Sequence, residues 1–167
     1  MSIISIDYFG TLDTYPSFWQ EVLEYVRLEG MEVYVVSGPW PKDLIEKLEF
    51  KGYTRGTHYD KVFSILSHLS GKGLEVWYDE DRDSWQSHGI AWYRSKSEIC
   101  KKVRSRIHFD SDPRFGPDFK SVPTRFVHTD CKARKAEIEK WHKALKLANT
   151  FDDWDEYEHM MGVMYSM

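Results

Sequence analysis

The chain has 167 residues, of which 41% are hydrophobic and 30% charged, and its formal net charge is −4 at pH 7. This length and composition predict one globular domain over residues 1–167 with a single sizeable core. The slight acidity gives no reason to expect a nucleic-acid-binding protein. No apolar stretch near the N-terminus is long enough for a signal peptide or a membrane span, and Cys100 and Cys131 have no metal-binding spacing. We therefore expect a cytoplasmic protein with no membrane partner.

The first 52 residues alternate between strand and helix patterns. Residues 2–8 and 31–38 are short runs rich in β-branched residues, which predict two buried strands. Residues 16–30 begin with a proline, carry an apolar stripe and end in glycine, and residues 42–52 are amphipathic, so both segments predict helices. This alternation indicates an α/β fold, a Rossmann-like parallel sheet with helices on both faces.

The middle of the chain has a weaker pattern. Residues 60–73 fit either a helix or a strand followed by a turn. Residues 74–81 predict a strand, and residues 89–95 could form a second strand that pairs with it as a hairpin or flap. Segment 53–95 is therefore interpreted as a possible small insert or flap. Its three tryptophans could stack on a base or ring, or could pack within the hairpin and the core. They are Trp77, Trp85 and Trp92.

The last third resumes the alternation. Residues 96–106 predict a helix, residues 107–112 and 123–129 predict strands, and residues 131–149 predict a further helix. The acidic, Met-rich end, residues 151–167, is interpreted as a short docked helix.

Polar residues follow three of the predicted strands. Asp7 follows the first strand, Ser37 and Gly38 end the second, and Asp110 and Asp112 end the strand that begins at residue 107. Ligands of open parallel α/β sheets bind at the carboxyl ends of the strands. Taken singly, each of these residues could instead be a turn or a helix cap, and the acid pair before a proline could form an Asx turn.

Together these residues, with Lys96 from the helix that precedes the acidic strand, fit phosphoryl transfer. An aspartate such as Asp7 is a competent nucleophile toward phosphorus. A serine hydroxyl, backbone N–H groups and a lysine can hold the phosphoryl oxygens. A second acidic strand end completes an all-oxygen site for a hard cation such as Mg²⁺.

The order of these residues resembles the haloacid dehalogenase superfamily, whose Rossmann-like core hosts mostly phosphatases. The family's first motif, D-x-D-G-T at the end of the first strand, is similar to "DYFGTL", which matches it at Asp7, Gly10 and Thr11. Its second motif, a serine or threonine after a hydrophobic strand, is similar to "VYVVSG" and gives Ser37. The resemblance covers roughly residues 2–127.

The third and fourth motifs of this family are a lysine and an acidic pair after a hydrophobic strand. Lys96 in "SKSEIC" fits the lysine, although Lys101 or Lys102 could replace it. "IHFDSD" resembles the fourth motif, with Asp110 in place and Asp112 one residue late. Only one helix separates the first two motifs, so the resemblance implies a small member without a large cap domain. Its site would be open, or covered by a flap or a partner.

The resemblance also implies a role for each residue. Asp7 would be the nucleophile of a Mg²⁺-dependent phosphohydrolase, and Lys96 would restrain the aspartates and bind the phosphoryl group. The substrate would be a small phosphorylated metabolite or a nucleotide. The other implied substrate-binding residues are Thr11, Ser37 and Gly38. The implied Mg²⁺ ligands are Asp7, the Phe9 main-chain carbonyl and Asp110, with Asp112 either as the second acidic ligand or in the outer shell.

Phe9 departs from the family's pattern. The phosphatases carry a second aspartate at this position, which protonates the leaving oxygen and then activates water, help worth roughly 10²–10⁴-fold. We favour a phosphohydrolase that uses a good leaving group or a substitute acid–base, for which Asp13 and His108 are near in sequence. The main alternative is a non-catalytic member that binds a phosphorylated ligand or a protein partner. A further alternative is a 2-haloacid dehalogenase, since those relatives carry an aromatic residue here and need no metal.

Overall fold

A five-stranded parallel sheet forms the centre of the protein, in a computed structural model that describes residues 2–129. The strand order is β3–β2–β1–β6–β7, and every neighbouring pair is parallel. The strands are β1 (Ile3–Ile6), β2 (Glu32–Ser37), β3 (Lys61–Ser64), β6 (Ile107–Asp110) and β7 (Arg125–His128). The helix predicted over 131–149, the docked helix predicted over 151–167 and Cys131 lie outside the described residues.

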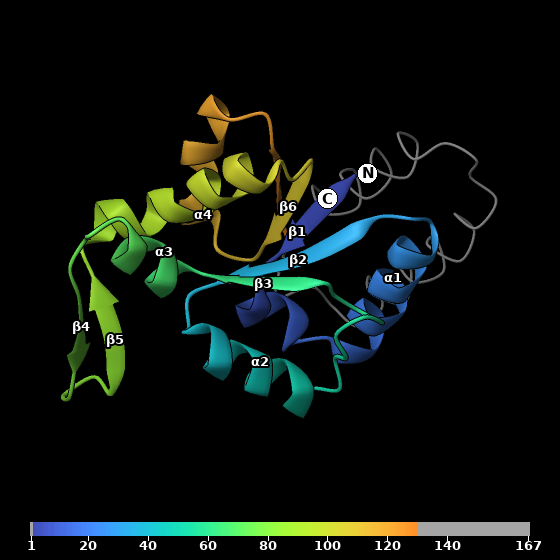
Figure 1. The fold of residues 1–167 in the computed structure, drawn as a ribbon, viewed down its shortest axis with the longest axis horizontal. Helices are drawn as coiled ribbons and strands as arrows, with labels where there is room; N and C mark the ends of the chain where they lie inside the picture. The colour runs from blue at the N-terminus through green and yellow to red at the C-terminus, as the bar shows by residue number, and fades with distance from the viewer. Residues whose placement is uncertain (1, 130–167) are drawn as a thin grey trace.

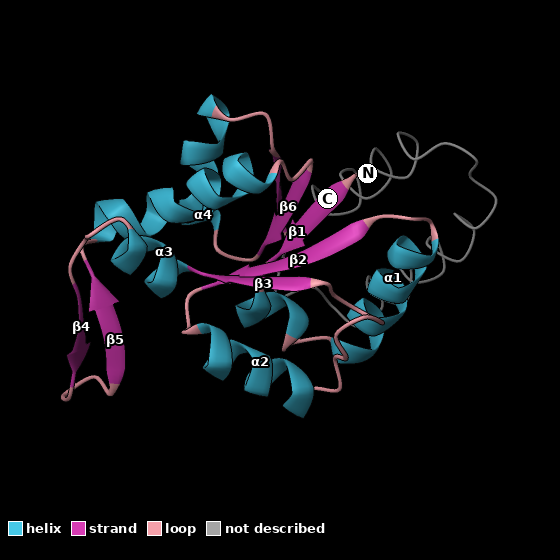
Figure 2. Ribbon diagram, in the orientation of Figure 1, coloured by secondary structure: helices cyan, strands magenta, loops and turns pink. Residues whose placement is uncertain are grey.

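Helices cover both faces of this sheet (Figure 1). One face carries α1 (Pro16–Leu28) and α2 (Pro41–Phe50), and the other carries α3 (Ile65–Gly71) and α4 (Gly89–Val103). A 3₁₀ segment, η2 (Pro113–Ser121), packs against α4. The predicted Rossmann-like α/β fold is therefore confirmed, and no large cap domain occurs within residues 2–129 (Figure 2).

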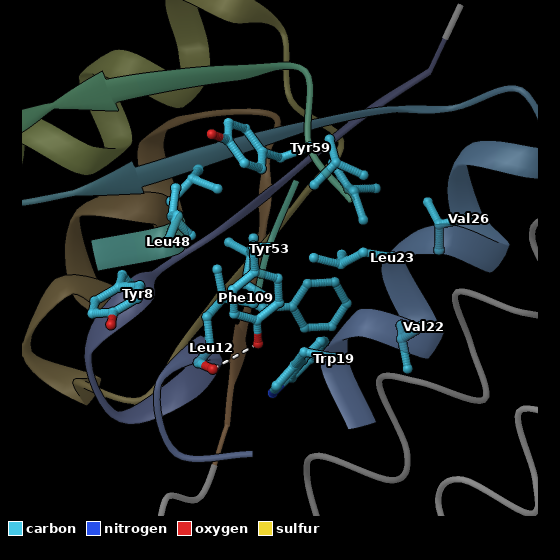
Figure 3. Packing of buried hydrophobic residues seen from close by; sticks show 14 of the residues in the cluster. Tyr8, Leu12, Trp19, Val22, Leu23, Val26, Leu48, Tyr53, Tyr59 and Phe109 are labelled. Atoms are coloured by element: carbon cyan, nitrogen blue, oxygen red, sulfur yellow. Dashed lines mark hydrogen bonds between the residues drawn. The ribbon is translucent and has the colours of Figure 1, made fainter. Parts of the chain in front are cut away.

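The larger hydrophobic core lies between the sheet and the layer of α1 and α2 (Figure 3). Strand side chains alternate between faces, so Ile4 and Ile6 enter this core while Ser5 points to the opposite face. The hydroxyl of Tyr53 donates a hydrogen bond of 2.6 Å to the Leu12 carbonyl, which joins the segment after α2 to the turn after β1 (Figure 3). The turn that follows β1 is thus anchored in the core. Other members of this cluster include Trp19, Val22, Leu23, Val26, Leu48 and Phe109.

The middle segment differs from its prediction in one element. Residues 60–73 contain both proposed elements, the strand β3 and then α3. A separate antiparallel pair, β4 (Val76–Asp79) and β5 (Ser84–Ser87), forms a hairpin that projects from the layer of α3 and α4 (Figure 1). The prediction of a strand over residues 89–95 is wrong, because these residues form the first part of α4.

Helical spacing explains this correction. Within α4 the half-buried Trp92 lies four positions before the buried Lys96, and the buried Ile99 and Cys100 lie three and four positions after it, which places them on one face of a helix. A strand would turn alternate residues toward solvent instead. Lys96 therefore lies in the interior of a longer helix and not at its start.

The strand order creates a crevice between β1 and β6. After β1 the chain continues through α1 on one face, and after β6 it continues through η2 on the other face. Ile6 is paired in register with Phe109, so the next residues, Asp7 and Asp110, leave the sheet side by side. Open α/β sheets bind ligands outside the carboxyl ends of two neighbouring strands whose following segments turn to opposite faces, as those of β1 and β6 do here. Among residues 2–129, no helix has the length and apolar character needed to cross a lipid bilayer.

Candidate active site at the ends of β1, β2 and β6

Asp7 is fixed at the carboxyl end of β1 by its neighbours. Its backbone N–H donates a hydrogen bond of 2.9 Å to the Phe109 carbonyl of β6. Ser37, the last residue of β2, donates its hydroxyl to Asp7 Oδ1 at 2.8 Å. Asp7 is 4% exposed and lines a cavity. Its Oδ2 has no hydrogen bond to any residue that the structure describes, so this oxygen is available to a ligand.

Lys96 joins the two acidic strand ends. Its Nζ lies 2.9 Å from Asp7 Oδ1 and 2.6 Å from Asp110 Oδ2, and all three side chains are buried. The Phe115 ring centroid lies 4.1 Å from the same Nζ, within the range of a cation–π contact. Lys101 and Lys102 are exposed further along α4. Of the three lysines considered from sequence, Lys96 is the one that the fold brings to the aspartates.

Two buried carboxylates share one ammonium group in this site. Burial raises the pKa of Asp7 to about 6, with Asp110 adding to the rise and Lys96 opposing it. Burial also disfavours the Asp110 carboxylate, but the Lys96 charge and the hydrogen bond from His108 outweigh burial and lower its pKa. Burial opposes the Lys96 charge as well, yet the two aspartates raise its pKa. With both acids ionised, the site has one more negative charge than positive, which favours a further cation.

The turn after β1 places the Phe9 main chain beside this site. Phe9 has ψ 130° and Gly10 has φ 73°, so the helical turn η1 (Tyr8–Leu12) is interrupted between them. The left-handed φ at position 10 favours glycine. The Phe9 carbonyl accepts a hydrogen bond of 2.8 Å from the Ser111 hydroxyl, and the Phe9 ring is 45% exposed and lines the cavity.

Thr11 is not brought to the other predicted residues. It is buried, and its Oγ1 lies 3.0 Å from the Thr129 hydroxyl. Thr11 does not line the cavity that contains Asp7. The structure therefore supports a role for Thr11 in joining the turn after β1 to the residue after β7.

Asp112 has the features of a helix cap. Its carboxylate accepts a hydrogen bond of 3.0 Å from the Arg114 N–H at the start of η2, and the Arg114 guanidinium approaches it at 2.8 Å. Hydrogen bonds from Arg114 lower the pKa of Asp112. The Asp112 N–H also donates to Asp110 Oδ1 at 2.9 Å, and Asp112 lines the cavity. Asp112 therefore helps to orient Asp110, as an outer-shell residue would.

His108 supports Asp110 from beneath the site. Its Nε2 lies 3.0 Å from Asp110 Oδ2 and its Nδ1 lies 2.9 Å from the Ser5 hydroxyl. Because an ionised carboxylate only accepts hydrogen bonds, Nε2 carries a proton and donates it in a hydrogen bond to Asp110. Burial lowers the pKa of His108, although Asp110 opposes this shift. The ring is fully buried against Phe119.

Neither candidate for a substitute acid–base reaches the cavity. His108 and Asp13 are both missing from its lining, and Asp13 Oδ1 accepts a hydrogen bond of 2.8 Å from the Gly10 N–H. The Asp13 carboxylate therefore stabilises the turn after β1. Sequence reasoning suggested both residues only because they are near the motifs in the chain.

The cavity has a volume of about 660 Å³ and connects the acidic site to the hairpin. Of the predicted site residues, Asp7, Phe9, Ser37, Gly38, Lys96 and Asp112 line it together. Asp110 is fully buried and contacts Lys96, but it does not line the cavity. The cavity also includes residues that the sequence did not single out, from the turn before α2, from α2 itself, from the hairpin and from η2. These are Trp40, Asp43, Lys47, Asp83, Ser84, Ser111 and Phe115. Ser111 lies at a strand end, between Asp110 and Asp112. The other six do not follow a predicted strand directly, so the strand-end pattern could not reveal them.

The oxygen atoms around Asp7 fit Mg²⁺ in their chemistry. Mg²⁺ is usually held by one or two carboxylates together with waters and substrate phosphates. Asp7 Oδ2, Asp110 Oδ1 and the Phe9 carbonyl are such oxygen donors, and the surplus negative charge of the site favours a cation. Within residues 2–129, no group of three or more His, Cys, Asp or Glu side chains could hold a metal ion by itself. A metal here would therefore depend on the main-chain carbonyl, water and the ligand.

The assembled groups comprise a buried carboxylate with a free oxygen, a lysine and a hydroxyl that donate to it, and a second carboxylate. Comparisons of the chain with models of known protein families, with curated proteins and with solved structures found no match. Function is therefore inferred from the residues of the site.

Proposed function

We propose that the protein is a Mg²⁺-dependent phosphohydrolase that acts through an aspartyl-phosphate on Asp7, as the resemblance to the haloacid dehalogenase superfamily implies. The observation that carries this proposal is Lys96 Nζ, which lies 2.9 Å from Asp7 and 2.6 Å from Asp110 at the ends of neighbouring strands. The proposed location is the cytoplasm, where a thiol such as that of Cys100 stays reduced.

The first step uses the free oxygen of Asp7. Oδ2 would attack phosphorus and form the aspartyl-phosphate bond, while the bond from phosphorus to the leaving oxygen breaks and that oxygen takes the electron pair. Ser37 Oγ and Lys96 Nζ, which donate to Asp7 Oδ1, are placed to donate to phosphoryl oxygens beside it. A water molecule would then attack the same phosphorus, release phosphate and regenerate the Asp7 carboxylate.

Mg²⁺ held by Asp7, Asp110 and the Phe9 carbonyl would neutralise the negative charge of the phosphoryl group. His108 and Asp112 contribute by positioning, because both donate hydrogen bonds to Asp110. Lys96 prevents the two buried carboxylates from repelling one another when the cation is released.

Phe9 limits the range of leaving groups. The Phe9 ring can neither give a proton to the leaving oxygen nor accept a proton from the attacking water. Asp13 and His108 do not line the cavity, so neither replaces the missing acid. We expect turnover to be fastest for substrates whose leaving group is stable as an anion, such as a phosphoanhydride or an aryl phosphate, and slow for simple alkyl phosphates.

The direct test is phosphate release across a panel of phosphorylated metabolites and nucleotides, measured with Mg²⁺ and with EDTA. Wild-type protein should release phosphate only with the metal, and Asp7→Asn should reduce release to the uncatalysed background. Asp81→Asn is the matched control, because Asp81 is exposed and outside the cavity, and it should retain full activity. Equal release by the wild type and Asp7→Asn would refute the proposal.

A non-catalytic binding protein on the same fold is the second candidate. The position of the Phe9 ring in the cavity, where the acid–base would act, favours it. This candidate predicts binding of a phosphorylated ligand that depends on Lys96 and Ser37, with no phosphate release from any member of the panel. Metal-dependent release that is lost in Asp7→Asn would exclude it.

A further inference from the structure

The cavity continues beyond the acidic site into a region with aromatic walls. Phe9, Trp40, Trp85, Trp92 and Phe115 all line it. Polar groups bind a phosphoryl group and a cation, and neither of these ligands requires an aromatic surface. Binding cavities typically combine apolar and aromatic walls with a few polar groups that orient the ligand. The aromatic region is therefore suited to the part of the ligand that carries the phosphate.

Trp85 is presented to the cavity by the register of the hairpin. Tyr78 pairs with Trp85 on one face, and Trp77 pairs with Gln86 on the other face. The Trp85 ring centroid lies 5.3 Å from that of Trp40, nearly perpendicular at 88°, and 5.7 Å from that of Tyr78. These edge contacts hold the indole in one orientation.

Trp85 and Trp40 do not serve as core residues. Both lie outside the two hydrophobic clusters of the described chain, and Trp85 is 42% exposed. Trp92 is different, since it packs against the second cluster. It also covers Gly38 so closely that a Cβ at that position would lie 2.9 Å from the ring. Trp92 thus forms a fixed wall, whereas Trp85 and Trp40 offer aromatic surface to a ligand.

Two carboxylates are among the polar groups of this region, together with the Lys47 ammonium of α2. Asp43 of α2 and Asp83 of the hairpin turn line the cavity together with Ser84. Asp83 has φ 49°, and the Tyr78 hydroxyl donates to its carboxylate. Ionised carboxylates can only accept hydrogen bonds, so they match a ligand whose ring carries N–H donors. Nucleobases combine such donors with a flat face that stacks on tryptophan, whereas a phenyl ring has the face without the donors.

We propose that the aromatic part of the cavity, formed by Trp40, Trp85, Asp43 and Asp83, is a nucleobase subsite and that the phosphorylated ligand is a nucleoside diphosphate, whose phosphoanhydride bond supplies the stable leaving group that turnover without an acid requires. This assignment rests on the proposed function for the position of the phosphate. A nucleic-acid strand fits poorly, because the chain has a net charge of −4 and two acids face the subsite, whereas strand binding depends on basic residues along the backbone.

Binding titrations in the Asp7→Asn background test the subsite without turnover. The probes, each with Mg²⁺, are the four nucleoside 5′-diphosphates, the corresponding 5′-monophosphates, the unphosphorylated nucleosides, ribose 5-phosphate, phenyl phosphate and inorganic phosphate. At least one nucleotide should bind about tenfold or more tightly than ribose 5-phosphate, which is the range expected of base stacking. Further substitution Trp85→Ala should remove this advantage and leave the affinity for inorganic phosphate unchanged.

Trp77→Ala is the matched control, because Trp77 lies on the opposite face of the same hairpin and outside the cavity lining. It should keep the preference for the nucleotide. Thermal unfolding of both variants checks that the fold is retained. A loss of preference in Trp77→Ala equal to that in Trp85→Ala would overturn the subsite.

The remaining outcomes separate this inference from the proposed function. Equal affinity for nucleotides and ribose 5-phosphate, with inorganic phosphate still bound, would overturn the subsite and retain the phosphate site. Phenyl phosphate bound as tightly as the best nucleotide would overturn the assignment to a nucleobase. Nucleosides bound through Trp85 with no affinity for inorganic phosphate would support the subsite and count against the proposed phosphate site.

Discussion

Lys96 is the residue on which the electrostatics of the site depend. It is almost fully buried, and it is the cation that contacts both Asp7 and Asp110 in the described structure. A buried ion pair contributes little net stability, but removal of one partner leaves the other charge buried and uncompensated. The residue that the proposed chemistry needs is therefore also one that the fold needs.

We predict that Lys96→Met lowers the free energy of unfolding by about 3–5 kcal/mol, because two buried carboxylates lose their ammonium partner. The measurement is urea unfolding at pH 7 in EDTA, so that no metal ion replaces the missing charge. Lys101→Met on the exposed face of α4 is the control and should change stability by less than about 0.5 kcal/mol. A Lys96→Met protein as stable as the wild type would show that the ion pairs are absent in solution.

At this scale the sequence predicted the residues that follow strands. Asp7, Ser37 and Asp110 could be found because each ends a hydrophobic run, and the fold brings them together with Lys96. The contacts of Ser111, His108 and Arg114 could not be predicted. Each depends on the direction of a side chain relative to a loop or a neighbouring strand, and no pattern within one segment encodes that direction.

At the scale of elements, Asp60 directly precedes β3 and joins it to α1 and β2. It lies at the edge of the sheet where β2 and β3 begin, and the crevice lies at the opposite edge, where the strands end. The Asp60 carboxylate accepts hydrogen bonds from the Arg27 guanidinium of α1 at 2.7 Å and 3.1 Å, and from the Val33 N–H of β2 at 2.8 Å. Burial would raise the pKa of Asp60, but these hydrogen bonds outweigh burial and lower it. Asp60 therefore orders the approach to β3.

We predict that Asp60→Asn lowers the free energy of unfolding by about 1 kcal/mol at pH 7, as the pair is partly exposed. Since the folded pKa lies below the unfolded value of about 3.9, the stabilisation is complete above that pH and is lost as the pH falls through the folded pKa. Urea unfolding of both proteins at pH 7 and at pH 3 measures this. A difference that is as large at pH 3 as at pH 7 would contradict the assignment.

Elements were predicted best where one pattern dominated. The β-branched runs of the first two strands and the apolar stripes of the first two helices each fit one kind of secondary structure better than any other. The composition of segment 89–95 predicts the wrong element, because Ile90, Trp92 and Tyr93 suit a strand, whereas the fold uses them in the first turns of α4. Here tertiary packing against α3 and η2 overrides local propensity.

For the whole molecule, the topology explains why distant motifs meet. The order β3–β2–β1–β6–β7 places the N-terminal strand at the centre, so residues near position 7 and near position 110 become neighbours. Alternation of strands and helices predicted the fold class, but strand order depends on which surfaces pack together. The cavity also needs the hairpin, whose placement beside α2 was not predictable from its own sequence.

The central claim is that Asp7 becomes phosphorylated. The measurement is mass spectrometry of the peptide that contains Asp7, after the protein is mixed with a substrate and Mg²⁺ and quenched in acid within one turnover. We predict a phosphoryl group on Asp7 in the wild type, none in Asp7→Asn, and none without the metal. An unmodified Asp7 peptide in protein that is releasing phosphate, or a phosphoryl group on another residue in its place, would contradict the account.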